Sequence, residues 1–312
     1  MDSSSRAATH RGRGGITRSR AARLEELQKY LFILPALALF ATFVLLPLGS
    51  ALYFSFTTWD GLRTPEWVGT RNYARAFADT IHVRSYVNVG VYILGTLVVE
   101  VAFGLLMAVL LASDRLGFAF MRGLFFSPMV LSMVAAGILW KYVYDYRTGL
   151  LNEALRAGGL GDFAHPWLSD PGTAMAGVIV VSGWKYAGFF MIIFLAALRR
   201  IPTSLYEAAM LDGATALQRL WHVTLPLLRE TTIIAVLLCV TGGFAAFDLF
   251  FTMTNGGPFN ATEIPTTWIV KQAFDRHNMG YGAALTVIMT VVVGVVSLAY
   301  LLATRRRHAV EY

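Results

Sequence analysis

The sequence predicts an all-helical membrane protein with six transmembrane helices. Two features of composition support this prediction: 56% of the 312 residues are hydrophobic and only 14% are charged, and the mean hydropathy is +0.57. A chain this apolar lacks the charge to cover an ordinary water-exposed surface, so the bilayer is its expected solvent. The third feature is a series of six long apolar stretches separated by more polar loops.

The six stretches are long enough to cross about 30 Å of hydrocarbon, which takes roughly 20 residues of helix, because every backbone donor and acceptor must be satisfied within the segment. They are expected at residues 30–56, 86–112, 123–144, 174–198, 231–253 and 280–304. Membrane helices tolerate proline, so kinks are expected at Pro35, Pro47 and Pro128. The first stretch is too long for the apolar part of a signal peptide, so we expect it to stay as a spanning helix.

The basic residues predict the orientation of these helices. With the N-terminus in the cytoplasm, sixteen Lys and Arg fall on the cytoplasmic side and eight on the other side. This bias predicts a multi-pass protein of the cytoplasmic (inner) membrane with both termini in the cytoplasm, and it explains the net charge of +7 better than nucleic-acid binding does. We expect residues 1–29 to be a disordered basic tail, residues 30–305 to be the transmembrane domain, and residues 306–312 to be a second cytoplasmic tail.

Cysteine and histidine placement argues against covalent or metal-based chemistry. The single cysteine, Cys239, lies inside an apolar stretch, so one chain cannot form a disulfide or a cysteine-based metal framework. Five histidines fall in loops without metal-ligand spacing, namely His82, His165, His222, His277 and His308. No nucleophile with a paired base appears in a span, so a membrane enzyme is a weak alternative.

The segment between the fourth and fifth stretches, residues 199–229, is polar but strongly patterned. Ser204 followed three residues later by Glu207 is a capping box, so a helix is expected to start at Leu205. Gly213 then supplies a C-terminal stop for that helix.

A second short helix is expected after this stop, from about Ala216. It should end before Pro226, because the residue that precedes a proline is pushed out of the helical region. The two helices would lie at an angle on the cytoplasmic face and offer small apolar surfaces from Leu205, Ala208, Ala209 and Leu211.

This loop resembles the signature of the permease family of ABC importers, which is EAA, three residues, Gly, nine residues, an aliphatic residue, one residue and Leu-Pro. The matching residues are Glu207, Ala208, Ala209, Gly213, Val223, Leu225 and Pro226, with Val in place of the commoner Ile. The resemblance implies a coupling helix, with Asp212 on its surface, that docks into a cleft of an ATP-binding subunit and transmits nucleotide-driven motion. The alternative is an interfacial hairpin in which Glu207 only caps its own helix.

Further segments resemble carbohydrate-uptake permeases, and in particular the larger maltose-transporter permease. They are residues 59–61, 67–69, 72–73, 184–202, 247–248, 254–258 and 278–281. The likeness covers residues 30–305 and implies the permease fold of type I ABC importers. It leaves the cargo open among an oligosaccharide, a monosaccharide, a polyol and a glycerophosphodiester.

The resemblance also implies partners. Such importers combine two homologous permeases, two ATP-binding subunits and an external solute-binding protein, and one copy of the loop motif here implies a second permease. None of the four lysines follows a glycine, so the sequence has no Walker A phosphate loop. ATP and Mg are therefore expected on the partner ATPase, and this chain is not expected to be an enzyme or to carry a cofactor.

Charged residues inside spans are costly and usually face a cavity or one another, and Glu100, Lys185 and Asp248 are such residues. In the resembled permeases the sugar site lies between the fourth and fifth spans. By motif position, this implies a substrate path lined by Ser182, Trp184, Lys185, Tyr186, Phe189, Phe244, Ala245, Phe247 and Asp248. Ala245 and Ala246 stand where the maltose site has asparagines, which puts maltose itself in doubt.

Four alternatives stay open from the sequence. Lys185 and Asp248 could form a structural ion pair between two helices, and Trp184 could serve helix packing alone. Lys185 could instead attract the phosphate of a glycerophosphodiester. The main rival class is a proton-coupled secondary transporter that relays protons through Glu100, Lys185 and Asp248, but the internal repeats common in such proteins are not visible.

Overall fold

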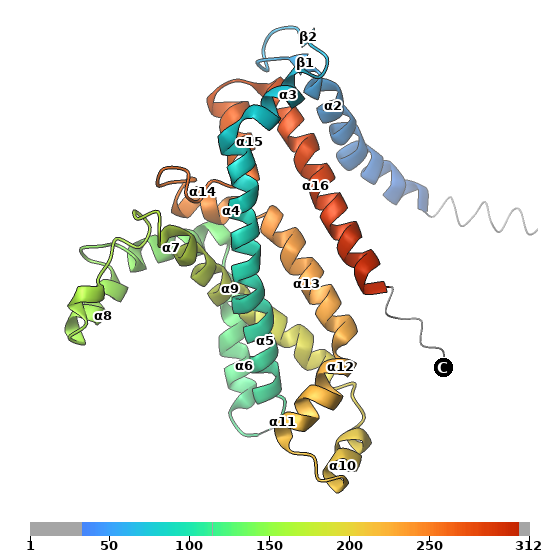
Figure 1. The fold of residues 1–312 in the computed structure, drawn as a ribbon, viewed down its shortest axis with the longest axis vertical. Coiled ribbons are helices and arrows are strands. Elements are labelled where there is room, and N and C mark those ends of the chain that lie inside the picture. Colours follow the sequence, from blue (N-terminus) through green and yellow to red (C-terminus); the bar gives the residue numbers. More distant parts are fainter. Residues whose placement is uncertain (1–32, 114, 306–312) are drawn as a thin grey trace, which may run out of the picture. The chain divides into compact units, whose positions relative to one another are not determined.

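A computed structural model describes residues 33–113 and 115–305, and the tails predicted at 1–29 and 306–312 lie outside these ranges. The predicted all-helical membrane architecture is confirmed (Figure 1). Among the described residues, four helices are long and apolar enough to span a membrane: Ile33–Ser55, Thr80–Leu110, Ala174–Leu198 and Met279–Thr304. Two bent helix pairs raise the number to six if each pair counts as one span.

The described residues divide into two compact units, with the boundary between Tyr53 and Phe54. In the first unit the helix from Ile33 contains a π-helical turn, η1 (Ala41–Leu45), and continues into α2 (Leu46–Ser55). The second unit opens with a two-stranded antiparallel sheet of β1 (Thr57–Thr58) and β2 (Glu66–Trp67), in which Thr57 pairs with Trp67.

The other elements of the second unit are helical, with η2, η5 and η6 as π-helical turns and η3 and η4 as 3-10 turns. In chain order they are α3 (Arg71–Ala78), α4 (Thr80–Thr96), η2 (Leu97–Ala102), α5 (Phe103–Leu110), α6 (Phe118–Phe126), η3 (Ser127–Val130), α7 (Met133–Val143), α8 (Leu150–Ala157), η4 (Gly161–Phe163), α9 (Ala174–Leu198), α10 (Thr203–Leu211), α11 (Ala216–Arg219), η5 (Leu220–Thr224), α12 (Leu225–Leu227), α13 (Arg229–Phe244), α14 (Phe247–Met253), α15 (Pro265–Val270), η6 (Lys271–Asp275) and α16 (Met279–Arg305).

Helix α9 is the central helix of this unit. The most apolar part of α9 is 61% buried, whereas that of α16 is 6% buried, so α9 packs against its neighbours over most of its surface and α16 exposes most of its own. One apolar cluster joins α9 to α5 and α13 through Phe190, Phe194 and Cys239. A second joins it to α4 and α14 through Val178 and Phe250.

The close contact between α9 and α6 depends on a glycine. A Cβ atom placed on Gly188 would lie 2.0 Å from the carbonyl oxygen of Phe125. Real atoms never approach so closely, so a hydrogen at this position is what lets the two backbones touch. Small residues serve the same purpose in many membrane helix pairs.

The third predicted span is broken, so the continuous helix expected over 123–144 is wrong in this respect. The segment Phe118–Val130 meets the segment Met133–Val143 at 101°. Pro128 lies in η3, just before the break, and Leu131 has the extended backbone angle ψ of 144°. Pro128 correctly predicted where the helix would be disturbed. The disturbance is a sharp turn of the chain and not a slight kink.

The fifth predicted span is also interrupted. Helix α13 ends at Phe244, two alanines follow outside any helix, and α14 begins at Phe247. A further bend of 70° precedes α13, between Leu227 and Arg229. The continuous helix expected over 231–253 is therefore replaced by two helices, and their junction at Ala245 and Ala246 leaves room beside α9.

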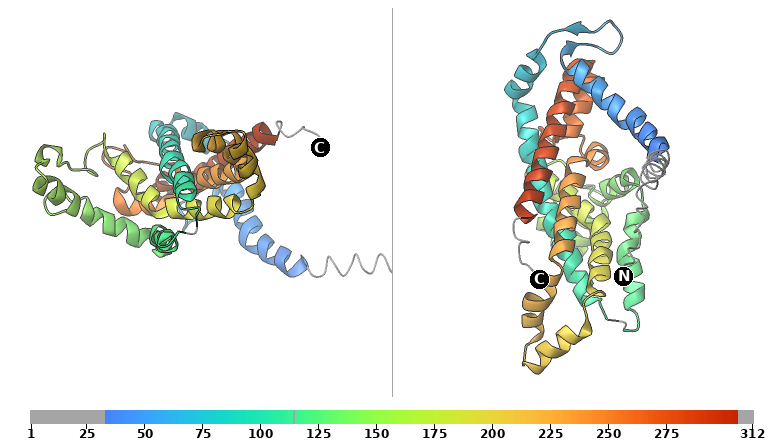
Figure 2. Two further views of the ribbon diagram at one scale, coloured as in Figure 1. Left: turned by 90° about the horizontal axis from the view of Figure 1, so that it is seen from below. Right: turned by 90° about the vertical axis from the view of Figure 1, so that its right-hand side faces the viewer.

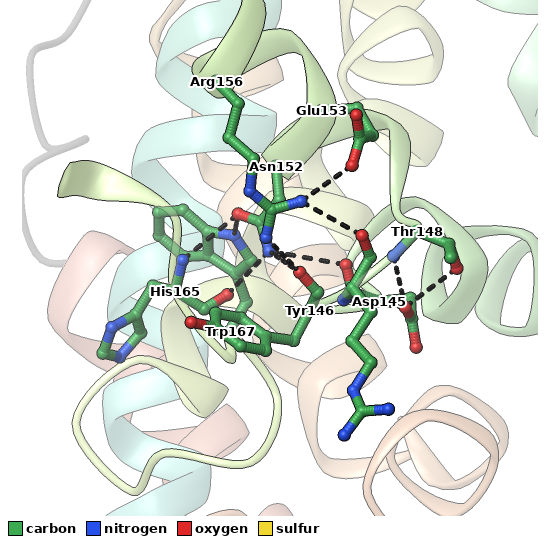
Figure 3. Close-up of polar contacts among 9 residues, drawn as sticks. Asp145, Tyr146, Thr148, Asn152, Glu153, Arg156, His165 and Trp167 are labelled. Atoms are coloured by element: carbon green, nitrogen blue, oxygen red, sulfur yellow. Dashed lines mark hydrogen bonds and ion pairs between the residues drawn. The ribbon is translucent and has the colours of Figure 1, made fainter. Parts of the chain in front are cut away.

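Two parts of the second unit project from its helical core. Helices α10 and α11 lie together at one end, and α8 lies apart from α9 on one side (Figures 1 and 2). The polypeptide around α8, residues 145–173, is organised by the buried side chain of Asn152, which contacts His165 and Trp167 (Figure 3).

Candidate functional site

The loop 199–229 contains the helix stop that the sequence predicts at Gly213. This residue has a φ of +77°, a left-handed conformation that favours glycine. The amide of Gly213 donates to the carbonyl of Met210 at 3.0 Å, and the amide of Ala214 donates to that of Ala209 at 2.9 Å. These two bonds form a Schellman motif, which satisfies the last carbonyls of α10 and reverses the chain.

The start of α10 differs from the prediction. The helix begins at Thr203 after Pro202, and no side chain caps its first amides, so the capping box expected at Ser204 and Glu207 is wrong. A capping box occurs instead at the start of α11, where Thr215 and Gln218 bond each other's backbone at 3.3 and 2.8 Å. Both helices have a capping-box sequence near their start. Only at α11 does a turn precede the helix and leave its first backbone amides free for the side-chain caps.

The second helix of the loop does not stop before Pro226. Helix α11, turn η5 and α12 run continuously to Leu227, and Leu225 keeps helical angles of −62° and −41°. The π-helical turn η5 has already left the regular hydrogen-bond ladder, so the missing amide of proline removes little there. The chain instead bends at Leu228.

The end of this loop presents an apolar surface that no described residue covers. Leu211 is 90% exposed, Leu217 64% and Trp221 62%, although none of them lies in a predicted span. A notch of about 290 Å³ separates α10 from η5, lined by Ala209, Asp212, Gly213, Ala214, Gln218, Arg219, His222 and Val223. Exposed apolar clusters of this kind usually mark a protein interface.

A polar contact ties α10 to the helix that re-enters the core. The hydroxyl groups of Tyr206 and Thr224 lie 3.1 Å apart. Four residues later Leu228 is fully buried in the cluster around α9. A movement of α10 would therefore be transmitted to the start of α13.

Helix α13 leads to a cavity of about 380 Å³ beside α9. The cavity is lined by Tyr92, Thr96, Glu100, Met129, Met133, Ser182, Tyr186, Phe189, Phe190, Leu238, Cys239, Gly242, Gly243, Ala245, Ala246 and Asp248. It thus lies between α4 with η2, α9, the break before α7, and the junction of α13 with α14. Its wall mixes aromatic rings with hydroxyl and carboxyl groups.

A hydrogen-bonded cluster forms one wall of this cavity. The hydroxyl of Ser182 donates to Oε1 of Glu100 at 2.6 Å, and the hydroxyl of Tyr92 lies 2.8 Å from that of Ser182. The thiol of Cys239 lies 3.9 Å from Oε2 of Glu100 and 3.4 Å from the hydroxyl of Thr96. Glu100 is 5% exposed and sits in η2, a π-helical turn of a kind common at functional sites.

Lys185 does not point into the cavity. Its ammonium group donates to the carbonyl oxygens of Pro128 at 3.4 Å, of Met129 at 3.2 Å, and of Leu131. Among the residues that the structure describes, it forms no ion pair with Asp248, so the structural pair considered from the sequence is wrong. Lys185 instead donates hydrogen bonds to the carbonyl groups at the helix break before α7.

The family described as "Binding-protein-dependent transport system inner membrane component" matches residues 100–308. The chain belongs to this family. It is a permease subunit of a binding-protein-dependent ABC importer in the inner membrane, as the loop motif predicted, and it is not itself an enzyme.

Two relatives and one solved structure agree with this assignment. The permease is 36% identical to the "Probable ABC transporter permease protein YurN" of Bacillus subtilis over 86% of this chain and 93% of that protein. It is 31% identical to the "Diacetylchitobiose uptake system permease protein NgcF" of Streptomyces coelicolor over 93% of this chain and 86% of that protein.

The solved structure is a bacterial ABC transporter involved in the import of the acidic polysaccharide alginate. One of its chains is similar to the permease with a TM-score of 0.79, over 93% of this chain and 99% of that chain. The two sequences are 21% identical, so this likeness supports the fold alone.

The structure brings five of the nine predicted path residues of the permease to the cavity, namely Ser182, Tyr186, Phe189, Ala245 and Asp248. The other four lie elsewhere: Trp184 packs edge-on against Trp140 at 5.6 Å, Phe247 stacks on Phe251 at 5.1 Å, Phe244 is buried in the apolar core, and Lys185 bonds the broken helix. Trp184 thus makes a packing contact with α7.

Sequence reasoning missed part of the cavity wall. It singled out Glu100 as an intramembrane charge but did not place it on the path, and it did not place Tyr92, Thr96 or Cys239 there either. Tyr92 and Thr96 lie on the same continuous helix as Glu100, and Cys239 joins them because α13 packs against that helix. Polar residues at positions 92, 96 and 100 recur every four residues, and this spacing was the available signal.

Proposed function

We propose that the permease carries a carbohydrate through the cavity beside α9, driven by an ATP-binding subunit that docks on the loop 199–229. The observation that carries this proposal is the structure of α10, which ends in a Schellman motif and exposes apolar side chains. The contact between Tyr206 and Thr224 connects α10 to the segment that leads through α13 to the cavity. A surface that must receive force from another protein needs a rigid stop and an uncovered apolar face, and this loop has both.

The coupling surface in this proposal comprises Glu207, Ala208, Ala209, Asp212, Gly213, Leu225 and Pro226. Glu207 is exposed and forms no hydrogen bond or ion pair with any residue that the structure describes, so its carboxylate is available to a cationic partner. The small side chains of Ala208 and Ala209 allow a groove of that partner to approach closely. Leu225 and Pro226 fix the turn that leads back to α13.

The proposal includes the partners and the orientation expected from the sequence. A second homologous permease completes the path, two ATP-binding subunits hold ATP and Mg, and an external solute-binding protein delivers the cargo. The loop 199–229 and both termini face the cytoplasm, which agrees with the excess of basic residues on that side. The polypeptide around α8 then lies outside, on the side from which cargo arrives.

Carbohydrate is the proposed cargo because the cavity offers what a sugar needs. Tyr186, Phe189 and Phe190 supply aromatic faces, and Ser182 and Glu100 supply hydrogen-bonding groups. A relative that covers most of the chain is named for diacetylchitobiose uptake. The proton-coupled alternative has no comparable support, because the family of the chain works with a binding protein.

The proposal is tested by reconstituting the importer with its own partners in proteoliposomes. Gly213→Val forces a β-branched residue into a left-handed conformation, and Leu211→Asp places a charge on the apolar surface. We expect each to lower ATP-driven uptake from a panel of labelled mono- and disaccharides by about tenfold or more while the permease still reaches the membrane, since a cost of about 1.4 kcal/mol at the coupling contact is already tenfold.

The matched control is Gly159→Val. Gly159 also has a positive φ, +76°, with no atom within 4 Å of an added Cβ, but it lies near α8 and not in the loop. It should leave uptake nearly unchanged. Unimpaired uptake in Gly213→Val, or uptake that collapses with the proton gradient while ATP stays high, would overturn the coupling role; ATP-driven uptake of non-sugar solutes only would overturn the cargo.

A further inference from the structure

The formal charges around the cavity are all of one sign. Glu100 and Asp248 are the acidic residues of its lining, and among the described residues no Lys, Arg or His lines it. Glu100 is nine-tenths buried in η2, and Asp248 is exposed at the start of α14. The two carboxylates therefore lie at different depths of one cavity, and no basic side chain in the described part of the chain lines the wall between them.

The nearest basic residue along α9, Lys185, is turned away and engaged. Its ammonium group bonds three carbonyl oxygens at the break before α7, and it is 3% exposed. Moving it toward the cavity would leave those carbonyls without donors inside an apolar surrounding, which is costly. Lys185 is therefore not available to a cargo phosphate or carboxylate. The glycerophosphodiester cargo considered from the sequence thus has no support from Lys185.

We infer that this cavity admits uncharged, hydroxyl-rich carbohydrates and excludes anionic ones such as uronic acids and sugar phosphates. The inference rests on the proposed function and narrows its cargo class. Like charges repel strongly where water is scarce, because the effective dielectric constant is low. An anionic cargo would also have to give up its hydration without gaining a basic partner from the described residues that line the cavity.

The geometry of Glu100 supports a direct contact with cargo. Its Oε1 accepts from Ser182, which fixes the carboxylate, whereas Oε2 has, among the described residues, only the distant thiol of Cys239 at 3.9 Å. A carboxylate is an acceptor only, so Oε2 matches the hydroxyl donors of a neutral sugar and cannot match another carboxylate. Such charge-assisted hydrogen bonds are among the stronger ones.

The inference is tested first by the reactivity of Cys239, the single cysteine of the chain, which lines the same cavity. The complete importer complex is treated with cationic, anionic and neutral methanethiosulfonates of similar size, and modification of the Cys239 peptide is followed by mass spectrometry. After correction for the reagents' intrinsic reactivities, we expect the cationic reagent to react about tenfold faster than the anionic one or more. The neutral reagent reports access alone.

Three variants assign this ratio to residues. Glu100→Gln and Asp248→Asn should each lower the cationic-to-anionic ratio by about threefold or more. Asp162→Asn removes an equal charge from an exposed position in η4 and should leave it unchanged. Equal rates in the unaltered importer, a ratio insensitive to both cavity variants, or a thiol that reacts with none of the reagents would each overturn the inference.

Transport supplies a second and separate readout. Proteoliposomes are given a neutral disaccharide and the same disaccharide oxidised to a uronic acid, with one unaltered binding protein throughout. Because only the permease changes, Asp248→Asn should raise uptake of the acid relative to the neutral sugar by about threefold. An unchanged ratio would contradict charge exclusion. If the importer carried neither sugar, the proposed cargo would fail, while the thiol measurement would still decide the charge of the cavity.

Discussion

The ammonium group of Lys185 donates a hydrogen bond to the carbonyl oxygen of Met129, 3.2 Å away, at the break between η3 and α7. The carbonyl groups at the end of any helix lack partners within that helix, and a bilayer offers no water to replace them. A side chain from α9 therefore supplies the donors that a continuous helix would have supplied. The contact thus joins two spans at the 101° bend.

Lys185→Met should destabilise the permease because it removes the donor and leaves buried carbonyls unpaired. Each such group costs about 1–3 kcal/mol, so the melting temperature of the detergent-solubilised importer should fall by several degrees. Lys141→Met is the control, since Lys141 is exposed on α7 and its loss leaves the break intact. If both variants melt together, the carbonyl contacts do not hold the bend.

Gly188→Ala should prevent α6 from packing on α9. The added methyl group would overlap the carbonyl oxygen of Phe125, a backbone atom that has no rotamer in which to escape. Overpacking of this kind typically costs about 1–3 kcal/mol and more where backbones must separate. Gly294→Ala is the matched control, because a Cβ there meets nothing within 4 Å. Membrane levels of the two variants, measured by immunoblot, should differ clearly.

The spans were predictable where apolarity alone decides the structure, and the breaks were not. The fourth stretch, expected at 174–198, agrees with α9 at Ala174–Leu198 because a long apolar run must satisfy its own backbone in lipid. The carbonyl group of Leu131 at the sharp turn accepts from Lys185, which is distant in the sequence. A hydropathy pattern or a nearby proline contains no information about such a partner.

The cavity was partly predictable from helical spacing. Ser182, Tyr186 and Phe189 recur at intervals of four and three residues, so they share one face of α9 and line the cavity together. Trp184 lies two residues after Ser182, on the opposite side of the helix, and the same spacing could have excluded it. The side chain of Lys185 is long enough to reach beyond the face of α9 on which its Cα lies. Its hydrogen-bond partners therefore could not be predicted from its position in the sequence.

Acid should weaken the contact that joins the start of α4 to α15 and α16. Oδ2 of Asp79 accepts hydrogen bonds from the indole of Trp268 at 3.0 Å and the hydroxyl of Tyr281 at 2.9 Å. Partial burial opposes ionisation, but these bonds, with backbone amides of His82 and Ile81, outweigh it and hold the pKa of Asp79 below its ordinary value of 3.8. The folded protein thus favours the charged carboxylate.

The sign of the effect follows from this lowered pKa. As the pH falls, the unfolded chain binds the proton first, so the stabilisation from Asp79 is complete above about pH 4 to 5 and is lost as the pH falls toward the folded pKa. The melting temperature of the unaltered permease should therefore exceed that of Asp79→Asn at neutral pH, and the gap should close below about pH 4. Asp162→Asn should show no such closing gap. A gap that widens in acid would contradict the assignment.

The polypeptide around α8 should open when its buried hub is removed. Asn152 is fully buried; its amide donates to the carbonyl of His165 at 3.0 Å, and its oxygen accepts from the indole of Trp167 at 2.9 Å (Figure 3). Asn152→Ala leaves these buried groups unpaired, at about 1–3 kcal/mol each, so limited proteolysis between residues 145 and 173 should accelerate about tenfold or more.

Glu153→Ala is the matched control for this prediction. Glu153 is the next residue of α8 and pairs with Arg156 at 2.7 Å, but the pair is exposed, and exposed ion pairs contribute little. Its cleavage rate should stay within about twofold of the unaltered protein. Thermal unfolding of the spans should change little in either variant, since residues 145–173 lie outside them. Equal cleavage of the two variants would mean that apolar packing around Trp167, and not the amide of Asn152, holds this segment in place.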